Sequence, residues 1–280
     1  MQRHSSITKP YAVLSTLLLA VSLTTFAFAQ TKAAAISQSQ PAAPATQAPA
    51  QRQLISLTFL RVKPGMGPEW QEFRKSETLP ALRKAEVKEQ GVWNTAVFSE
   101  GGGYVIVTPI ESLTQYDNPS PTVRALGQEG ARAYAAKAAR FTESVHSVAI
   151  ETRPELSILP SPSAQPQLAV VTTTTIVAGR DDEYENFIKT TVLPAVKKAA
   201  PKGYLVSRVV YGGNLNQYTS VVLLDNFADL QRWREAFAKE AVTAKLAAKS
   251  VGIVTSRENA IYRYIPELSI MPAPQKTENK

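Results

Sequence analysis

The feature that most constrains the fold of this chain is a seven-residue segment that occurs twice. Residues 154–160 read Pro-Glu-Leu-Ser-Ile-Leu-Pro and residues 266–272 read Pro-Glu-Leu-Ser-Ile-Met-Pro, so six of the seven positions are identical. Each copy closes a stretch of about a hundred residues, and the two stretches also correspond upstream. The sequence therefore predicts a tandem duplication, in which any fold has to be built twice.

An offset of 114 residues aligns the two copies over most of their length, and the closing segments align at an offset of 112. The first offset pairs glycine, acidic, aromatic and Leu-Pro-Ala positions: Gly65 with Gly179, Glu69 with Glu183, Phe73 with Phe187, and 79–81 with 193–195. Proline inside a helix costs about 3 kcal/mol. A proline shared at residues 80 and 194 therefore favours a common origin of the two copies.

Both copies show the element order β-α-β-β-α-β. In the first unit, residues 53–160, we predict strands over 54–62, 92–99, 104–108 and 145–152, a helix bent by Pro80 near Thr78, and a second helix over 120–141. In the second unit, residues 167–272, we predict strands over 168–177, 204–211, 218–224 and 254–264, and helices over 181–200 and 228–250. Residues 161–166 form the linker, and 273–280 a polar tail.

The predicted fold class is α+β, with two ferredoxin-like units in one chain. A four-stranded antiparallel sheet with both helices on one side leaves its other face bare, and that face needs a partner. The second strand, with Val92, Ala96 and Phe98 on one side and Trp93, Thr95 and Val97 on the other, has no cleanly polar side. We therefore expect the two sheets to pack face to face as a sandwich or barrel, with each closing segment lying along the other unit.

The first 29 residues are typical of a signal peptide. A basic start is followed by an apolar run, residues 11–29, that ends in Ala-Phe-Ala, a small-x-small cleavage site. A single-span anchor is the alternative, although five Ser and Thr residues dilute the run. Residues 30–52, rich in Ala, Gln and Pro, are expected to be a disordered linker. We predict an exported protein, periplasmic or secreted, without a membrane span after cleavage.

Composition excludes several kinds of site. The chain has no cysteine, and the mature chain keeps one histidine, His146, so we expect no metal site and no cofactor. The formal charge is +8. A basic chain can bind nucleic acid, but here Lys and Arg are scattered over predicted helix faces, so we expect no nucleic-acid partner.

The element order resembles the ferredoxin-like units of the dimeric α/β-barrel superfamily. The resemblance includes the Val-Lys-Pro-Gly turn at 62–65, a helix with Glu69 and Phe73, and the Leu-Pro-Ala at 79–81. It covers residues 53–272 and is strongest for the antibiotic-biosynthesis-monooxygenase-like (ABM-like) and NIPSNAP-like branches. It implies a barrel closed within one chain, so that a monomer is possible. Haem-binding branches use a helical histidine, whereas His146 falls on a predicted strand.

Eight side chains are candidates for a cavity between the two sheets. The catalytic candidates are the base, amide, guanidinium and carboxylate groups of His146, Asn94, Arg208 and Glu258. The ligand-binding candidates are the aromatic residues Trp93, Tyr104, Tyr218 and Tyr262. Each can also be an ordinary surface or core residue. The leading hypothesis is a protein that binds a small, partly apolar or aromatic molecule; a cofactor-independent monooxygenase-like enzyme and a non-catalytic structural or interaction protein are the alternatives.

Overall fold

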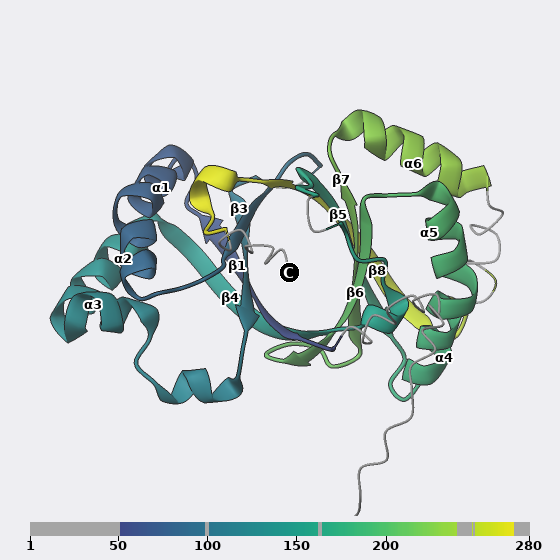
Figure 1. The fold of residues 1–280 in the computed structure, drawn as a ribbon, viewed down its shortest axis with the longest axis horizontal. Helices are drawn as coiled ribbons and strands as arrows, with labels where there is room; N and C mark the ends of the chain where they lie inside the picture. Colours follow the sequence, from purple (N-terminus) through teal and green to yellow (C-terminus); the bar gives the residue numbers. More distant parts are fainter. Residues whose placement is uncertain (1–50, 99–100, 162–163, 240–247, 249, 272–280) are drawn as a thin grey trace, which may run out of the picture. The chain divides into compact units, whose positions relative to one another are not determined.

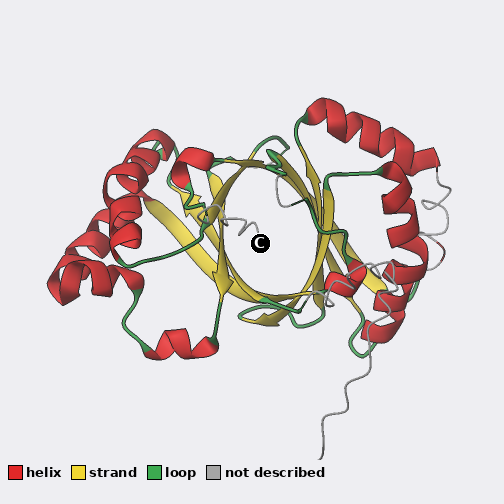
Figure 2. Ribbon diagram, in the orientation of Figure 1, coloured by secondary structure: helices red, strands yellow, loops and turns green. Residues whose placement is uncertain are grey.

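The β-branched runs of the sequence form eight strands that close into one barrel (Figures 1 and 2). The structure is a computed structural model that describes residues 51–98, 101–161, 164–239, 248 and 250–271. These residues belong to one compact unit, Gln47–Lys280. The predictions for the signal peptide, for most of the 30–52 linker and for the 273–280 tail lie outside the described residues.

The two halves contain the same elements in the same order, except for a short helix, η2, that is described only in the first. The first half consists of β1 Leu54–Val62, α1 Gly67–Phe73, η1 Arg74–Thr78, α2 Leu79–Lys84, β2 Gly91–Thr95, β3 Gly103–Ile110, η2 Leu113–Asp117, α3 Pro121–Phe141, β4 Thr142–Thr152 and η3 Pro154–Leu156. The second half consists of β5 Leu168–Ile176, α4 Asp181–Phe187, η4 Ile188–Val192, α5 Leu193–Ala199, β6 Gly203–Tyr211, β7 Gln217–Leu224, α6 Phe227–Lys239, β8 Val254–Tyr264 and η5 Pro266–Leu268. No helix among the described residues is both long and apolar enough to span a membrane.

The prediction for the second strand was too long at its end. β2 stops at Thr95, and Phe98 has a φ of 57° and is 94% exposed. A positive φ takes the chain out of the extended conformation. The last predicted helix, 228–250, is described as α6 only to Lys239, and most of the remainder lies outside the described residues.

Strand pairing between the halves closes the barrel. The strand order is β1-β3-β2-β8-β5-β7-β6-β4, and every pair is antiparallel. Each half contributes four strands, and the halves meet at two seams, β4–β6 and β2–β8. The sequence was compatible with either a sandwich or a barrel, and the strand pairing shows a closed barrel. In this arrangement no sheet edge is left unpaired.

Alternate residues of each strand face the helices or the barrel interior. Along β1, Leu60 and Val62 pack with Trp70 of α1. The residues of opposite parity, Ile55 and Leu57, pack instead with Val148, Ile150 and Val209 inside the barrel. In Figure 1, α1, α2 and α3 cover one side of the barrel and α4, α5 and α6 the other. Each sheet thus has one face under its own helices and one face toward the other half.

A π-helical turn precedes the proline in the first helix of each half. The turns are η1 and η4, directly before the Leu-Pro pairs at 79–80 and 193–194. The Ser76 hydroxyl donates to the carbonyl of Glu72, and the Thr190 hydroxyl donates to that of Asn186, both at 2.7 Å. The predicted irregularity near Thr78 is therefore a local widening of the helix that a proline can follow, with side-chain hydroxyls bonding carbonyls in the turn.

The two closing segments are exchanged between the halves, as predicted. Leu156, at the end of the first half, is part of the core of the second half, and Leu268 is part of the core of the first. Ser157 accepts from the backbone N–H of Val206, and Ser269 from that of Val92, both at 2.9 Å. Backbone bridges add the pairs Ile158–Tyr204 and Gln90–Ile270. Each half is thus completed by a segment of the other.

A buried arginine fixes the second of these segments. Arg74 is 3% exposed, and its Nε donates to the carbonyl of Leu268 at 2.8 Å. Its Nη2 donates to Gln90 at 2.6 Å. Burial lowers the pKa of Arg74 to about 10, so the guanidinium stays charged at neutral pH. The aligned residue of the second half is Ile188, which lies in that half's apolar core.

Truncation of the exchanged leucines should destabilise the whole barrel. We expect Leu156→Ala and Leu268→Ala each to lower the free energy of unfolding by about 2–5 kcal/mol, because each leaves a cavity in the core of the other half. Leu159→Ala is the matched control in the same segment, since Leu159 is 56% exposed, and should change stability by less than about 0.5 kcal/mol. Denaturant unfolding measures all three. Equal effects at residues 156 and 159 would contradict the exchange.

Candidate functional site

The structure divides the eight candidate residues between two faces of the sheets. Cα pairing places Asn94 beside Tyr104 and Arg208 beside Tyr218. Both tyrosines belong to the cores beneath the helices. These four residues therefore face the helices and not the space between the sheets where we expected them. The other four candidates lie on the opposite side of their strands and face the barrel interior: Trp93, His146, Glu258 and Tyr262.

The interior candidates lie toward opposite ends of the barrel. Because every strand pair is antiparallel, β4 and β8 run in the same direction. His146 and Glu258 lie early in these strands, near one end, and both are exposed. The His146 ring stacks on Phe59, with centroids 6.4 Å apart. Tyr264, the last residue of β8, lies at the other end and pairs with Trp93.

An aromatic pocket opens at the Trp93 end of the barrel. It has a volume of about 320 Å³ and is lined by residues of β2 and the loop before it, β3, β8, the linker and the second closing segment: Glu89, Gly91, Trp93, Val107, Ala164, Gln165, Pro166, Tyr264, Ile270 and Met271. The Trp93 and Tyr264 rings lie 5.0 Å apart with their planes at 53°. The Tyr264 hydroxyl donates to Sδ of Met271. We call this the aromatic pocket.

Gly91 keeps the aromatic pocket open. A Cβ at this position would lie 3.6 Å from Nε1 of Trp93 and 3.8 Å from Cε2 of Tyr264, which are ordinary contact distances. Any larger side chain would extend into the pocket itself. The backbone at Gly91 does not require glycine, because its φ is not positive. Its small size is therefore what distinguishes this position.

At the β4–β6 seam, the positions that correspond to the pocket residues carry different side chains. Gly91 pairs with Val107 as Leu205 pairs with Val221 in the aligned strands. Leu205 thus occupies the place of Gly91. The places of Trp93 and Tyr264 are taken by Ser207 and Thr152, which pair with each other across the β4–β6 seam. The aromatic pocket therefore lies at the β2–β8 seam, where both halves line it, and its pair of rings is not repeated at the β4–β6 seam.

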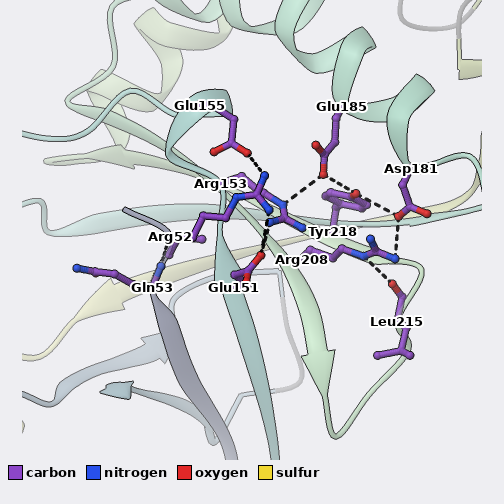
Figure 3. Close-up of polar contacts among 11 residues, drawn as sticks. Arg52, Gln53, Glu151, Arg153, Glu155, Asp181, Glu185, Arg208, Leu215 and Tyr218 are labelled. Atoms are coloured by element: carbon purple, nitrogen blue, oxygen red, sulfur yellow. Dashed lines mark hydrogen bonds and ion pairs between the residues drawn. The ribbon is translucent and has the colours of Figure 1, made fainter. Parts of the chain in front are cut away.

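A cluster of charged side chains lies under α4 at the β4–β6 seam (Figure 3). Nη1 of Arg153 binds the carboxylate of Glu151, and its Nε forms an ion pair with Glu185 at 3.2 Å that lacks hydrogen-bond geometry. Arg52 contacts Glu151 at 3.4 Å and Glu155 at 2.5 Å. Burial would raise the pKa of Glu155, but hydrogen bonds and the charges of Arg52 and Arg153 hold it below its ordinary value. We call this cluster the charged seam.

Tyr218 lies at the centre of the charged seam. Its hydroxyl donates to Glu185 at 2.8 Å and lies 3.2 Å from Oδ1 of Asp181. Asp181 also binds Nη2 of Arg208 at 2.9 Å, and Arg208 lies over the Tyr218 ring. Burial, followed by the hydrogen bond to Glu185 and the nearby carboxylates, raises the pKa of Tyr218 above its ordinary value. The phenol is therefore a neutral donor between two charged acceptors.

The corresponding contacts of the first half involve uncharged side chains at two places. Gln71 Nε2 donates to the Tyr104 hydroxyl at 2.9 Å, where the second half has Glu185 and Tyr218. Asn94 takes the place of Arg208, and its buried Oδ1 has no hydrogen-bond partner within the described residues. The two seams of the barrel therefore differ: the β4–β6 pair Arg208–Glu151 lies among ion pairs, whereas its β2–β8 counterpart is Asn94 with Arg263.

Of the residues that line the pocket, only Trp93 was predicted from the sequence to be a site residue. Gly91, Glu89 and Tyr264 were not predicted. A signal was present in the alignment of the two copies, where the glycine at 91 stands opposite the leucine at 205. We had used the positions that the copies share, whereas the pocket is built from positions at which they differ.

Metal ligation has no cluster to support it in the described part of the chain. Among these residues, no group of three or more His, Cys, Asp or Glu side chains is arranged to hold a metal ion. His146, one of the predicted catalytic candidates, lies on β4 and not on a helix. The expectation that the protein needs no cofactor stays a prediction.

The charged seam should make Tyr218 more important for stability than Tyr104. We expect Tyr218→Phe to lower the free energy of unfolding by about 1.5–3 kcal/mol, since it removes a hydrogen bond to charged acceptors. Tyr104→Phe is the matched control, loses a bond to a neutral amide, and should cost about 1 kcal/mol. Urea unfolding of the two variants checks the difference. Equal losses would show that the ion pairs add nothing at this seam.

Comparison with known proteins supports the fold. No protein-family model matches this sequence, and no curated protein is significantly similar to it. A candidate monooxygenase from Lactobacillus acidophilus NCFM has a similar structure at 8% identity and a TM-score of 0.52, over 76% of this chain and 94% of its own. A second, from Fusobacterium nucleatum, matches at 12% identity and a TM-score of 0.53, over 75% of this chain and 91% of its own.

A NIPSNAP domain protein from Burkholderia xenovorans is also similar, at 15% identity and a TM-score of 0.30, over 40% of this chain and 98% of its own. At such identities a structural likeness shows the fold and not the activity. The eight-stranded closed barrel and the two monooxygenase-like neighbours lead to one conclusion: the chain has the dimeric α/β-barrel fold, built from ferredoxin-like halves.

Proposed function

We propose that this protein binds a small, partly apolar molecule in the aromatic pocket. The observation that carries the proposal is the pocket itself, about 320 Å³ in volume and lined by the rings of Trp93 and Tyr264. Small-molecule sites usually have volumes of about 300–1,000 Å³, apolar and aromatic walls and few polar groups. The pocket is at the lower end of that range. A ligand with one aromatic ring and a short branched substituent has a suitable size.

The proposal is for binding and not for catalysis. The monooxygenase-like alternative requires His146, Asn94 or Arg208 to point into a cavity. His146 faces the barrel interior, whereas Asn94 and Arg208 face the helices. Arg208 is also engaged by Asp181 and by the carbonyl of Leu215. The arrangement therefore supports a binding site more directly than it supports an acid–base pair.

The proposal extends to the origin and the location of the chain. The reciprocal bonds of Ser157 and Ser269 support descent of both halves from one duplicated unit. The apolar run that ends in Ala-Phe-Ala supports export to the periplasm or the medium, with cleavage after Ala29. An exported binding protein without cysteine would depend on its core and on the exchanged segments for stability.

Filling the pocket should abolish binding without unfolding the barrel. We expect para-tert-butylphenol to bind the mature protein and to change the fluorescence of Trp93. Gly91→Leu, which copies Leu205 of the second half, should weaken that binding at least about tenfold and leave the melting temperature unchanged or higher, because leucine suits a strand better than glycine. Calorimetry and thermal melting measure the two quantities. Unchanged affinity in Gly91→Leu would place the ligand elsewhere.

Tryptophan replacements provide the control for this assay. The chain has three tryptophans, and Trp233 lies on α6, away from the pocket lining. Trp233→Phe should retain the fluorescence response to the phenol, and Trp93→Phe should lose it. A response that follows Trp233 would contradict a site at the barrel end.

Export can be checked on the mature chain. When the full chain is produced in a bacterium, we expect the protein recovered from the periplasm or the medium to begin at Gln30. N-terminal sequencing or intact-mass measurement tests this directly. Ala29→Arg should block cleavage, because the signal peptidase site requires a small residue. A protein that keeps Met1 and stays with the membrane would favour the single-span anchor.

A further inference from the structure

We infer that the aromatic pocket selects organic cations, such as an aryl or alkyl ammonium compound, over neutral molecules of the same shape. This inference rests on the proposed function, since it concerns the chemistry of the same pocket. Three observations carry it: the angle between the two rings, the charge at the pocket wall, and the comparison with the aligned positions at the β4–β6 seam.

The two rings form a corner that suits a compact cation. Trp93 and Tyr264 have centroids 5.0 Å apart and planes inclined at 53°, so a group in the pocket can contact both rings. The faces of aromatic rings carry negative electrostatic potential, and Trp and Tyr attract quaternary and alkyl ammonium groups within about 6 Å of the ring centroid. A neutral tert-butyl group would obtain the dispersion contacts but not this attraction.

The charge at the pocket wall is negative. Of the ten residues that line the pocket, only Glu89 carries a charge. Glu89 takes part in none of the ion pairs among the described residues, and its neighbour Lys88 is directed to Glu111 at 2.8 Å. Glu89 is exposed, and its carboxylate, which joins no ion pair among the described residues, can complement a cation bound in the pocket. The net charge of +8 acts at longer range, where salt screens it.

The second half shows that the fold does not require these groups. Gly203, Leu205 and Ser207 occupy the aligned places of Glu89, Gly91 and Trp93. A Cβ at Gly203 would already lie 3.1 Å from Leu223 and 3.3 Å from Pro160, so that position has no free space. The carboxylate, the Trp93–Tyr264 ring pair and the glycine thus occur together at the β2–β8 seam and are absent from the aligned positions at the β4–β6 seam.

A pair of probes with one shape and different charge tests the inference. The probes are para-tert-butylphenol and para-hydroxyphenyltrimethylammonium, in which a central carbon is replaced by a positively charged nitrogen. Calorimetry with the mature protein should give about tenfold tighter binding of the cation, from the rings and the carboxylate together. Glu89→Gln should reduce this preference severalfold and leave the affinity for the phenol unchanged. Glu267→Gln removes the same charge from the second closing segment, outside the pocket lining, and should change neither.

The outcomes separate the inference from the proposed function. If both probes bind equally, in a manner lost in Gly91→Leu, the pocket binds small molecules but does not select cations. If Glu89→Gln and Glu267→Gln lower cation binding equally, the effect is one of net charge and the inference is again wrong. If neither probe binds, the proposed function fails together with the inference. A cation preference that depends on Glu89 supports both.

Discussion

The whole structure depends on the need of two antiparallel sheets to cover the faces that their own helices leave bare. Neither half can do this alone, because α1–α3 and α4–α6 lie on the outer sides of the barrel (Figure 1). Pairing of β4 with β6 and of β2 with β8 joins the edges. The exchanged segments then place Leu156 and Leu268 in the opposite cores. Folding of each half is therefore coupled to the presence of the other.

Within this pseudo-symmetric frame, the two halves differ where chemistry is possible. At the β4–β6 seam, Glu151 and Arg153 of the first half and Glu185 of the second form the charged seam, and Leu205 fills the place that corresponds to Gly91. At the β2–β8 seam, Asn94 pairs with Arg263, and Gly91 leaves the aromatic pocket open. One seam thus contributes chiefly to cohesion, and the other contains the pocket that we propose for ligands.

Much of the fold could be predicted from the sequence, because the same pattern of residues occurs twice along the chain. The β-α-β-β-α-β order and the exchange of the closing segments followed from positions that the copies share. The site could not be predicted in the same way. Asn94 and Arg208 were expected between the sheets, but a strand alternates between its two faces, and the parity that decides the face becomes clear only when pairing is known. Tyr104 and Tyr218 were misplaced for the same reason.

The short connection between Pro160 and Leu168 has a consequence for how such a barrel can change. In an assembly of two identical chains, any replacement on the interface is made at both copies, so a residue that opens one seam opens the other and a new ion pair is gained or lost in duplicate. With both modules on one polypeptide, each position can mutate independently. One seam can then be opened for a guest while the opposite seam is reinforced, so a loss of packing at Gly91 can be offset on the far side of the ring by bonds such as that between Tyr218 and Glu185.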